Sequence, residues 1–232
     1  MLTIRSTAAL LLLLSVACKE TVDSSGVRTS GVYPEIEVTA NGSGDSTVRV
    51  ELKVGGSNSN TYLELRGDDE LVATVGDTKK TMKESGNGYV ATFPVDEEGT
   101  EFKIAFLRGD EDESAPESKV ALPAPFEITL EQTEASRTDD ELKYTWDPAG
   151  DGNLDWDIDG DCIKQDNGST PDDGSNKFDK DDIDTFESDK DKTCSVTLQL
   201  VREKSGHVDA AFEKGGSIVA RHVRKKTFTS TP

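Results

Sequence analysis

Short runs in which every second residue is apolar are the feature that most limits how this chain can fold. In "TVRVELKV" the apolar residues are Val48, Val50, Leu52 and Val54, and "TYLELRG" follows with Leu63 and Leu65. An antiparallel strand with one face on a core and the other in water has this period of two. Asn41-Gly42 and similar turn dipeptides separate the runs. The alternation therefore predicts an all-β chain made of antiparallel sheets.

The predicted strands fall into two groups. The stretch "ALPAPFEITL" separates them, because Pro123 and Pro125 cannot donate to a central strand ladder and the alternation restarts at Phe126. Each group has about seven short strands within about a hundred residues, which is typical of a β-sandwich. We therefore expect two antiparallel β-sandwich domains, at residues 32–122 and 123–232.

The N-terminus "MLTIRSTAALLLLLSVAC" has a basic residue, a short apolar core and small residues before Cys18. This pattern indicates an export signal over residues 1–17 that is too short to span a bilayer. The ending is similar to the lipobox of bacterial lipoproteins, in which the cysteine is acylated and becomes the mature N-terminus. Ser15 to Ala17 also suits ordinary cleavage, so free secretion is the alternative. Residues 18–31 are then the acylated Cys18 and a flexible tether.

The chain has three cysteines. If Cys18 carries lipid, Cys162 and Cys194 remain as a pair that an oxidising compartment would join. A bond between them closes a loop of about thirty residues and stabilises by roughly 3–4 kcal/mol on the chain-entropy argument. The alternative is two reduced, buried thiols.

Charge excludes one class of partner. The formal net charge is −20, and it is about −21 without the signal segment, because Arg5 is the only charged residue there. Such a chain repels nucleic acid, so no nucleic-acid partner is expected. Within this acidic chain, "ARHVRKK" near the C-terminus is basic, and we interpret it as the guard of a strand edge.

The stretch "DGNLDWDIDGDC" matches the opening of an EF-hand loop, with Asp155, Asp157 and Asp159 followed by Gly160. The flanking Pro148 and Gly150 do not favour the helices that an EF-hand needs. A strand explains more residues. Its buried face would carry Leu154, Trp156 and Ile158, and its solvent-exposed face would carry the aspartates.

Carboxylates at alternate positions of one strand lie about 7 Å apart, and together they could share a cation. Calcium is therefore the one cofactor that the sequence suggests, with candidate ligands Asp155, Asp157, Asp159 and Asp161. From Asp151 to Asp191 there are fourteen Asp and one Glu against four Lys, a local charge of −11. The alternative is a solvated acidic loop with turns at Asn167-Gly168 and Asp173-Gly174 and no ion.

Catalytic motifs are poor. The two histidines, His207 and His222, give few candidates for a catalytic triad or a zinc site, and no Gly-rich phosphate loop occurs. Trp146 and Trp156 lie in predicted strands and are expected in the core rather than on a sugar-stacking platform. Two Arg-Gly-Asp tripeptides, at 66–68 and 108–110, are interpreted as strand ends running into acidic turns. The chain is therefore expected not to be an enzyme.

The lipobox-like end, the strand pair "LKYTW" and "LDWDIDGDC", and the closing "CSVTLQLVREKSG" with "GGSIVARHVRKKTFTST" resemble bacterial surface lipoproteins with tandem immunoglobulin-like or fibronectin type III-like domains. The resemblance implies architecture and brings no catalytic residues. By the sorting habit of Gram-negative lipoproteins, Lys19 after the cysteine implies the outer membrane, facing the periplasm or the surface. Cys162 departs from the antibody pattern because it follows the Trp156 strand.

The expected function is that of a non-catalytic surface lipoprotein that acts as a structural or protein-binding module. The alternative is a calcium-dependent adhesion or carbohydrate-binding lipoprotein. The expected partners are the membrane, through the lipid anchor, and an extracellular protein or polysaccharide.

Overall fold

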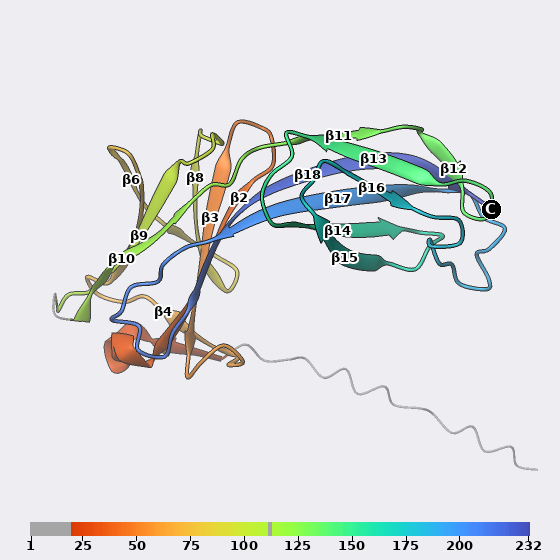
Figure 1. Ribbon diagram of the computed structural model, residues 1–232. Helices are drawn as coiled ribbons and strands as arrows, with labels where there is room; N and C mark the ends of the chain where they lie inside the picture. Colours follow the sequence, from red (N-terminus) through yellow and green to blue (C-terminus); the bar gives the residue numbers. More distant parts are fainter. Residues whose placement is uncertain (1–19, 111–112) are drawn as a thin grey trace, which may run out of the picture.

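A computed structural model describes residues 20–110 and 113–232. The predicted signal segment and the lipidation site Cys18 lie outside the described residues. Almost all regular structure is β-strand, arranged in three sheets, which confirms the predicted all-β fold class (Figure 1). Among the described residues, no helix has the length and apolar character needed to cross a bilayer.

An eleven-stranded sheet runs through the whole molecule (Figure 1). Its main path is β1-β4-β3-β2-β18-β17-β14-β15, with β8 and β7 branching from β3, and β12 from β18. The bounds are β1 Glu20–Asp23, β2 Val32–Ala40, β3 Ser46–Val54, β4 Thr61–Glu64, β7 Lys83–Ser85, β8 Gly88–Phe93, β12 Glu134–Ser136, β14 Asn153–Gly160, β15 Asp166–Pro171, β17 Cys194–Ser205 and β18 Ser217–Thr231.

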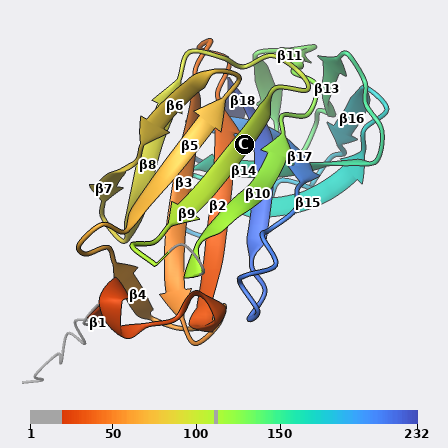
Figure 2. The same ribbon diagram turned by 90° about the vertical axis from the view of Figure 1, so that its left-hand side faces the viewer.

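A four-stranded sheet, in the order β10-β9-β5-β6, covers one part of the large sheet (Figure 2). Its strands are β5 Glu70–Val75, β6 Thr78–Thr81, β9 Glu101–Leu107 and β10 Ala115–Ala121. The alternate residues of β9 that face inward are Phe102, Ile104 and Phe106, and all three are buried. They pack with the inward residues of β2 and β3, so the period of two seen in the sequence becomes the first hydrophobic core.

A three-stranded sheet, in the order β11-β13-β16, covers the other part of the large sheet. Its strands are β11 Glu127–Leu130, β13 Leu142–Asp147 and β16 Ser175–Phe178. Tyr144 and Trp146 of β13 are buried against Leu154 and Ile158 of β14 in a second core. Trp146 is therefore a core residue, as expected.

The ribbon of β17 and β18 joins the two cores. The two strands pair without a register shift from Cys194↔Ser230 to Ser205↔Val219. Ile218 and Ala220 near the start of β18 belong to the first core, whereas Phe228 near its end belongs to the second. The division into domains at residues 122 and 123 stays a prediction, and β18 contributes side chains to both cores.

Residues 20–31 differ from the flexible tether that was expected. They form β1, which pairs in parallel with β4, and two short 3-10 helices, Ser24–Gly26 and Thr29–Gly31. Arg108 holds this segment, because its guanidinium donates to the Ser24 carbonyl over 2.8 Å and to the Val27 carbonyl over 3.1 Å. The segment has few apolar residues, so its sequence did not indicate that it packs against the fold. Its position depends on hydrogen bonds to Arg108, which is distant in the sequence.

Candidate functional site

The acidic stretch that begins at Asp151 forms a strand and not an EF-hand loop. In β14, Leu154 and Ile158 are buried and Trp156 is partly buried, while Asp155 and Asp159 are exposed. Both edges of β14 are paired, with β15 on one side and β17 on the other. The core strand predicted from the alternation is therefore confirmed.

The candidate calcium ligands do not converge. Asp155, Asp157 and Asp159 follow one another along β14, and Asp161 lies in the turn after the strand. Asp157 accepts a hydrogen bond from Gln165 over 2.9 Å. Within residues 20–110 and 113–232, no three His, Cys, Asp or Glu side chains gather closely enough to hold a metal ion. Calcium binding stays a prediction without a preformed cluster.

The turn expected at Asn167-Gly168 is wrong, because these residues lie inside β15. Gly168 pairs with Trp156 across the ladder. A Cβ atom at Gly168 would lie 2.6 Å from the indole of Trp156, so only glycine leaves room for that ring. Trp156 also packs edge-on against Phe178, with ring centroids 5.1 Å apart. The dipeptide therefore makes space for an aromatic ring and does not reverse the chain.

A disulfide between Cys162 and Cys194 closes the acidic segment, as predicted, with a Cα separation of 5.8 Å. Arg137 fastens the same segment from inside. Its guanidinium is buried and donates to the carbonyls of Lys190 and Lys192, each over 2.9 Å, and to Ser230 over 3.0 Å. Burial lowers the pKa of this guanidinium. The acidic segment is thus held at several points.

Asp172 and Arg202 form a buried ion pair at the edge of the second core. The Arg202 Nε and Asp172 Oδ2 atoms are 2.6 Å apart, and their side chains are 6% and 0% exposed. Trp146 donates its indole N–H to the same carboxylate over 2.6 Å. Arg202 also donates to the carbonyls of Ala124 and Pro148. Both side chains are buried and bind groups of their own chain, so we assign the pair a structural role.

Electrostatics agree with that role. Burial alone would raise the pKa of the Asp172 carboxyl, but hydrogen bonds from Arg202 and Trp146 outweigh it and hold the pKa below its ordinary value. The carboxylate is therefore ionised over a wide pH range, and it is fully enclosed by its partners. It is not placed to accept a proton from a substrate.

The two histidines lie in different structural settings. His207 exchanges backbone hydrogen bonds with Lys119. His222 is completely buried on β18, and neither ring nitrogen makes a hydrogen bond of ordinary geometry with the described residues. Burial, helped by the charge of Arg224, lowers the pKa of His222 to about 4, while Asp96 and the Pro123 backbone oppose this shift only in part.

Acid should destabilise the fold through His222. Its pKa falls from 6.5 in the unfolded chain to about 4 in the folded one, so the unfolded state binds the proton first. Its contribution is complete above about pH 6.5 and should fall by roughly 3 kcal/mol as the pH drops through 4. Urea unfolding at several pH values should show this loss in the wild type and a flatter profile in His222→Leu. Parallel profiles for both proteins would contradict the assignment.

The Arg-Gly-Asp tripeptides are parts of the fold, as the sequence suggested. Arg108 is 9% exposed, and its Nε lies 3.0 Å from Asp69 Oδ2. Arg66 Nε lies 3.1 Å from Asp23 Oδ1. Both arginines therefore bind groups of this chain and hold the N-terminal segment in place.

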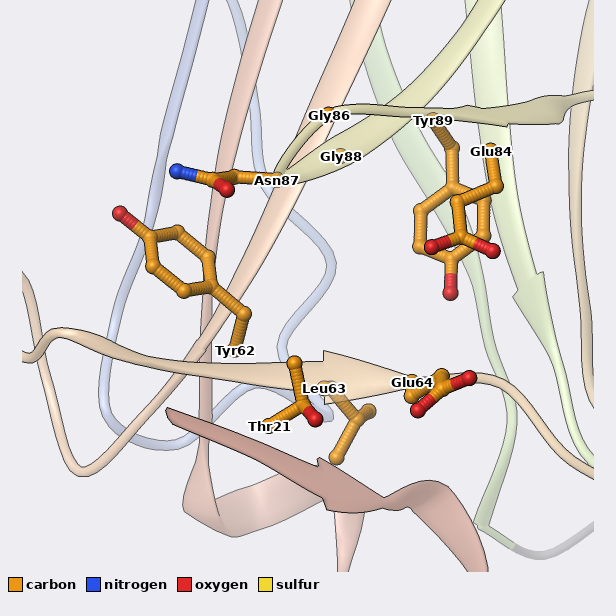
Figure 3. A pocket seen from close by; sticks show the side chains of 9 residues that line it. All are labelled: Thr21, Tyr62, Leu63, Glu64, Glu84, Gly86, Asn87, Gly88 and Tyr89. Carbon is orange, nitrogen blue, oxygen red and sulfur yellow. The ribbon is translucent and has the colours of Figure 1, made fainter. Parts of the chain in front are cut away.

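A narrow slot separates β4 from the β7-β8 hairpin (Figure 3). Tyr89 points from β8 toward β4, where its hydroxyl accepts a hydrogen bond from the Leu65 N–H over 2.9 Å. Burial raises the pKa of this phenol. The volume is about 10 Å³, which is room for about one water molecule. The slot is a packing seam and does not accommodate an organic ligand.

A larger hollow lies on the outer face of the four-stranded sheet. It has a volume of about 640 Å³, within the usual range for binding sites. Its apolar residues are Val72 of β5, Ala105 and Leu107 of β9, and Pro116 of β10. Glu70, Lys79 and Lys103 also line it. We call this hollow the β5-β9 groove.

The fold and these surfaces define the class: an all-β protein with two cores under a shared sheet and an apolar groove on one outer face. Searches against models of protein families and against curated proteins found no match.

Proposed function

We propose that this chain is a non-catalytic lipoprotein of the cell envelope that binds another protein through the β5-β9 groove. The groove is the observation that carries the proposal. An outward sheet face is ordinarily polar, yet four of the residues that line this hollow are apolar. The lipid anchor and the location at the outer membrane are part of the proposal, and the lipobox-like sequence before Cys18 and the following Lys19 support them.

The non-catalytic part of the proposal is supported by the use that the fold makes of its reactive side chains. His222 is buried, and Asp172 is enclosed by Arg202 and Trp146. A calcium-dependent adhesin or carbohydrate-binding protein has less support, since the aspartates of β14 lie along a strand and Trp146 is in the core.

A photo-reactive amino acid at Ala105, in the full chain produced in its own cells, tests this function. Irradiation should yield an adduct of one discrete mass, because Ala105 lines the groove. Leu107→Asp should reduce the adduct by about tenfold or more, as expected when an apolar contact residue becomes charged. The same photo-reactive group at Thr92, which is exposed on β8, is the matched control.

Equal adducts at Ala105 and Thr92, or none at Ala105, would reject the groove as a binding face. The anchor is tested in the same cells. Labelled palmitate should enter the wild-type protein and not Cys18→Ala, and wild-type protein without label would reject the lipoprotein assignment.

A further inference from the structure

One edge of β18 is open between two partner strands. Along this edge β2 pairs with β18 as far as Ala40↔His222, and β12 begins to pair at Glu134↔Thr229. Within residues 20–110 and 113–232, no strand pairs with this side of β18 from 223 to 228. Figure 1 shows β2 and β12 on separate stretches of β18. We call residues 223–228 the β18 gap.

The backbone in the β18 gap presents groups that can pair. The Thr229 N–H donates to the Thr133 carbonyl, so residue 229 faces this edge. The ladder with β17 is unbroken from Ser195↔Thr229 to Val201↔Val223. Every second residue of β18, counted back from Thr229, therefore points its backbone N–H and C=O groups to the same edge of the strand. Lys225 and Thr227 therefore turn their backbone N–H and C=O groups toward the gap.

Burial changes at the same place. From His222 to Phe228, every second residue of β18 is buried except Lys226. The buried residues are His222, Arg224 and Phe228. Lys225, Lys226 and Thr227 are three consecutive exposed residues. Both faces of the strand are therefore uncovered where its edge is unpaired.

A hollow of about 490 Å³ lies at the β18 gap and includes Asn41, Gly42, Glu127 and Ile128 in its lining. Arg224, Lys225 and Lys226 line it too, and Arg224 forms an ion pair with Glu127 over 3.2 Å, so two of the three cations remain without a carboxylate partner in the hollow. Gly42 makes room for the guanidinium, because a Cβ atom there would lie 2.9 Å from Arg224 Cζ. Neither Lys225 nor Lys226 forms an ion pair with any described residue.

We propose that the β18 gap binds an extended acidic peptide segment of a partner protein, which adds a strand between β2 and β12. Six residues of strand span about 20 Å, enough for a short peptide to pair its backbone with β18. The unpaired lysines disfavour a neutral or basic strand and attract one with carboxylates. This surface is separate from the β5-β9 groove, so either proposal can fail alone.

The probe is a fluorescent peptide in which glutamate alternates with valine, titrated into the folded protein at low salt. Fluorescence anisotropy should show saturable binding that weakens with salt, and hydrogen exchange at the Lys225 and Thr227 amides should slow. Lys225→Glu/Lys226→Glu should weaken binding by about tenfold or more. Lys204 and Lys214 are two exposed lysines outside the gap, so Lys204→Glu/Lys214→Glu makes the same change of charge and is the matched control, which should bind normally.

A second probe has the same side chains with methylated backbone nitrogens. It should lose binding, because strand addition needs its N–H groups. Equal binding of both probes would show that charge alone attracts the peptide, without backbone pairing, and would overturn the proposal. Equal weakening by the Lys204/Lys214 and Lys225/Lys226 double variants would do the same. Self-association of the chain that the Lys225/Lys226 variant abolishes would show that a second copy fills the gap, against the proposal.

Discussion

Replacing Arg202 with methionine is expected to lower the free energy of unfolding by about 3–5 kcal/mol. The substitution leaves the Asp172 carboxylate 0% exposed without its cation. It also removes the donor to the Ala124 and Pro148 carbonyls, at the edge of the second core. The loss should appear in urea unfolding monitored by Trp fluorescence, since Trp146 hydrogen-bonds the same carboxylate.

A double variant separates the unpaired charge from the loss of packing. Asp172→Asn in the Arg202→Met background keeps an acceptor for the Trp146 indole but removes the negative charge, so it should recover much of the stability. A single variant that loses less than about 1 kcal/mol would show that the pair is not a significant part of the fold. The pKa of Asp172 is depressed, so its contribution is present near neutral pH and is lost only as the pH falls below the ordinary carboxyl range.

Removing the disulfide with Cys162→Ser/Cys194→Ser is expected to lower the free energy of unfolding by about 3–4 kcal/mol. The two cysteines are 32 residues apart, and the bond restricts the unfolded chain over that whole segment. Few apolar side chains of the segment reach the core, where Ile163, Phe178 and Ile183 are the main examples. Other contacts cannot easily compensate for the lost bond.

Urea unfolding with and without reductant provides the measurement. In reductant, the wild type should unfold at the same urea concentration as the double serine variant. The unfolding midpoint of the variant should not change when reductant is added. A variant as stable as the oxidised wild type would show that Arg137, which binds the Lys190 and Lys192 carbonyls, holds the segment without the bond.

Strands with an apolar face could be predicted from the sequence, and polar ones could not. The runs "ELVATV" and "EFKIAFL" correspond to β5 and β9 because their alternation reflects a buried side. In contrast, β6 reads "TKKT" and is exposed throughout, and β15 reads "DNGSTP". These strands form because their backbones pair with a neighbouring strand, β5 for β6 and β14 for β15. The residues of β6 and β15 alone do not indicate that pairing.

The candidate site shows the same limit. Asp172 is one of fourteen aspartates in a run, and nothing local separates it from those that face water. Its partner carried a usable signal. Val196, Leu198 and Leu200 of β17 are buried, and Arg202 continues the same inward series. An arginine on the inward side of a strand predicts a buried acid, although it cannot identify which one.

The length of β18 also affects how the protein can unfold. Its fifteen residues contribute side chains to both cores. Detaching this one strand would expose apolar side chains of both cores at once, so neither core can open along β18 without weakening the other. The two cores are therefore expected to lose their structure in one cooperative transition.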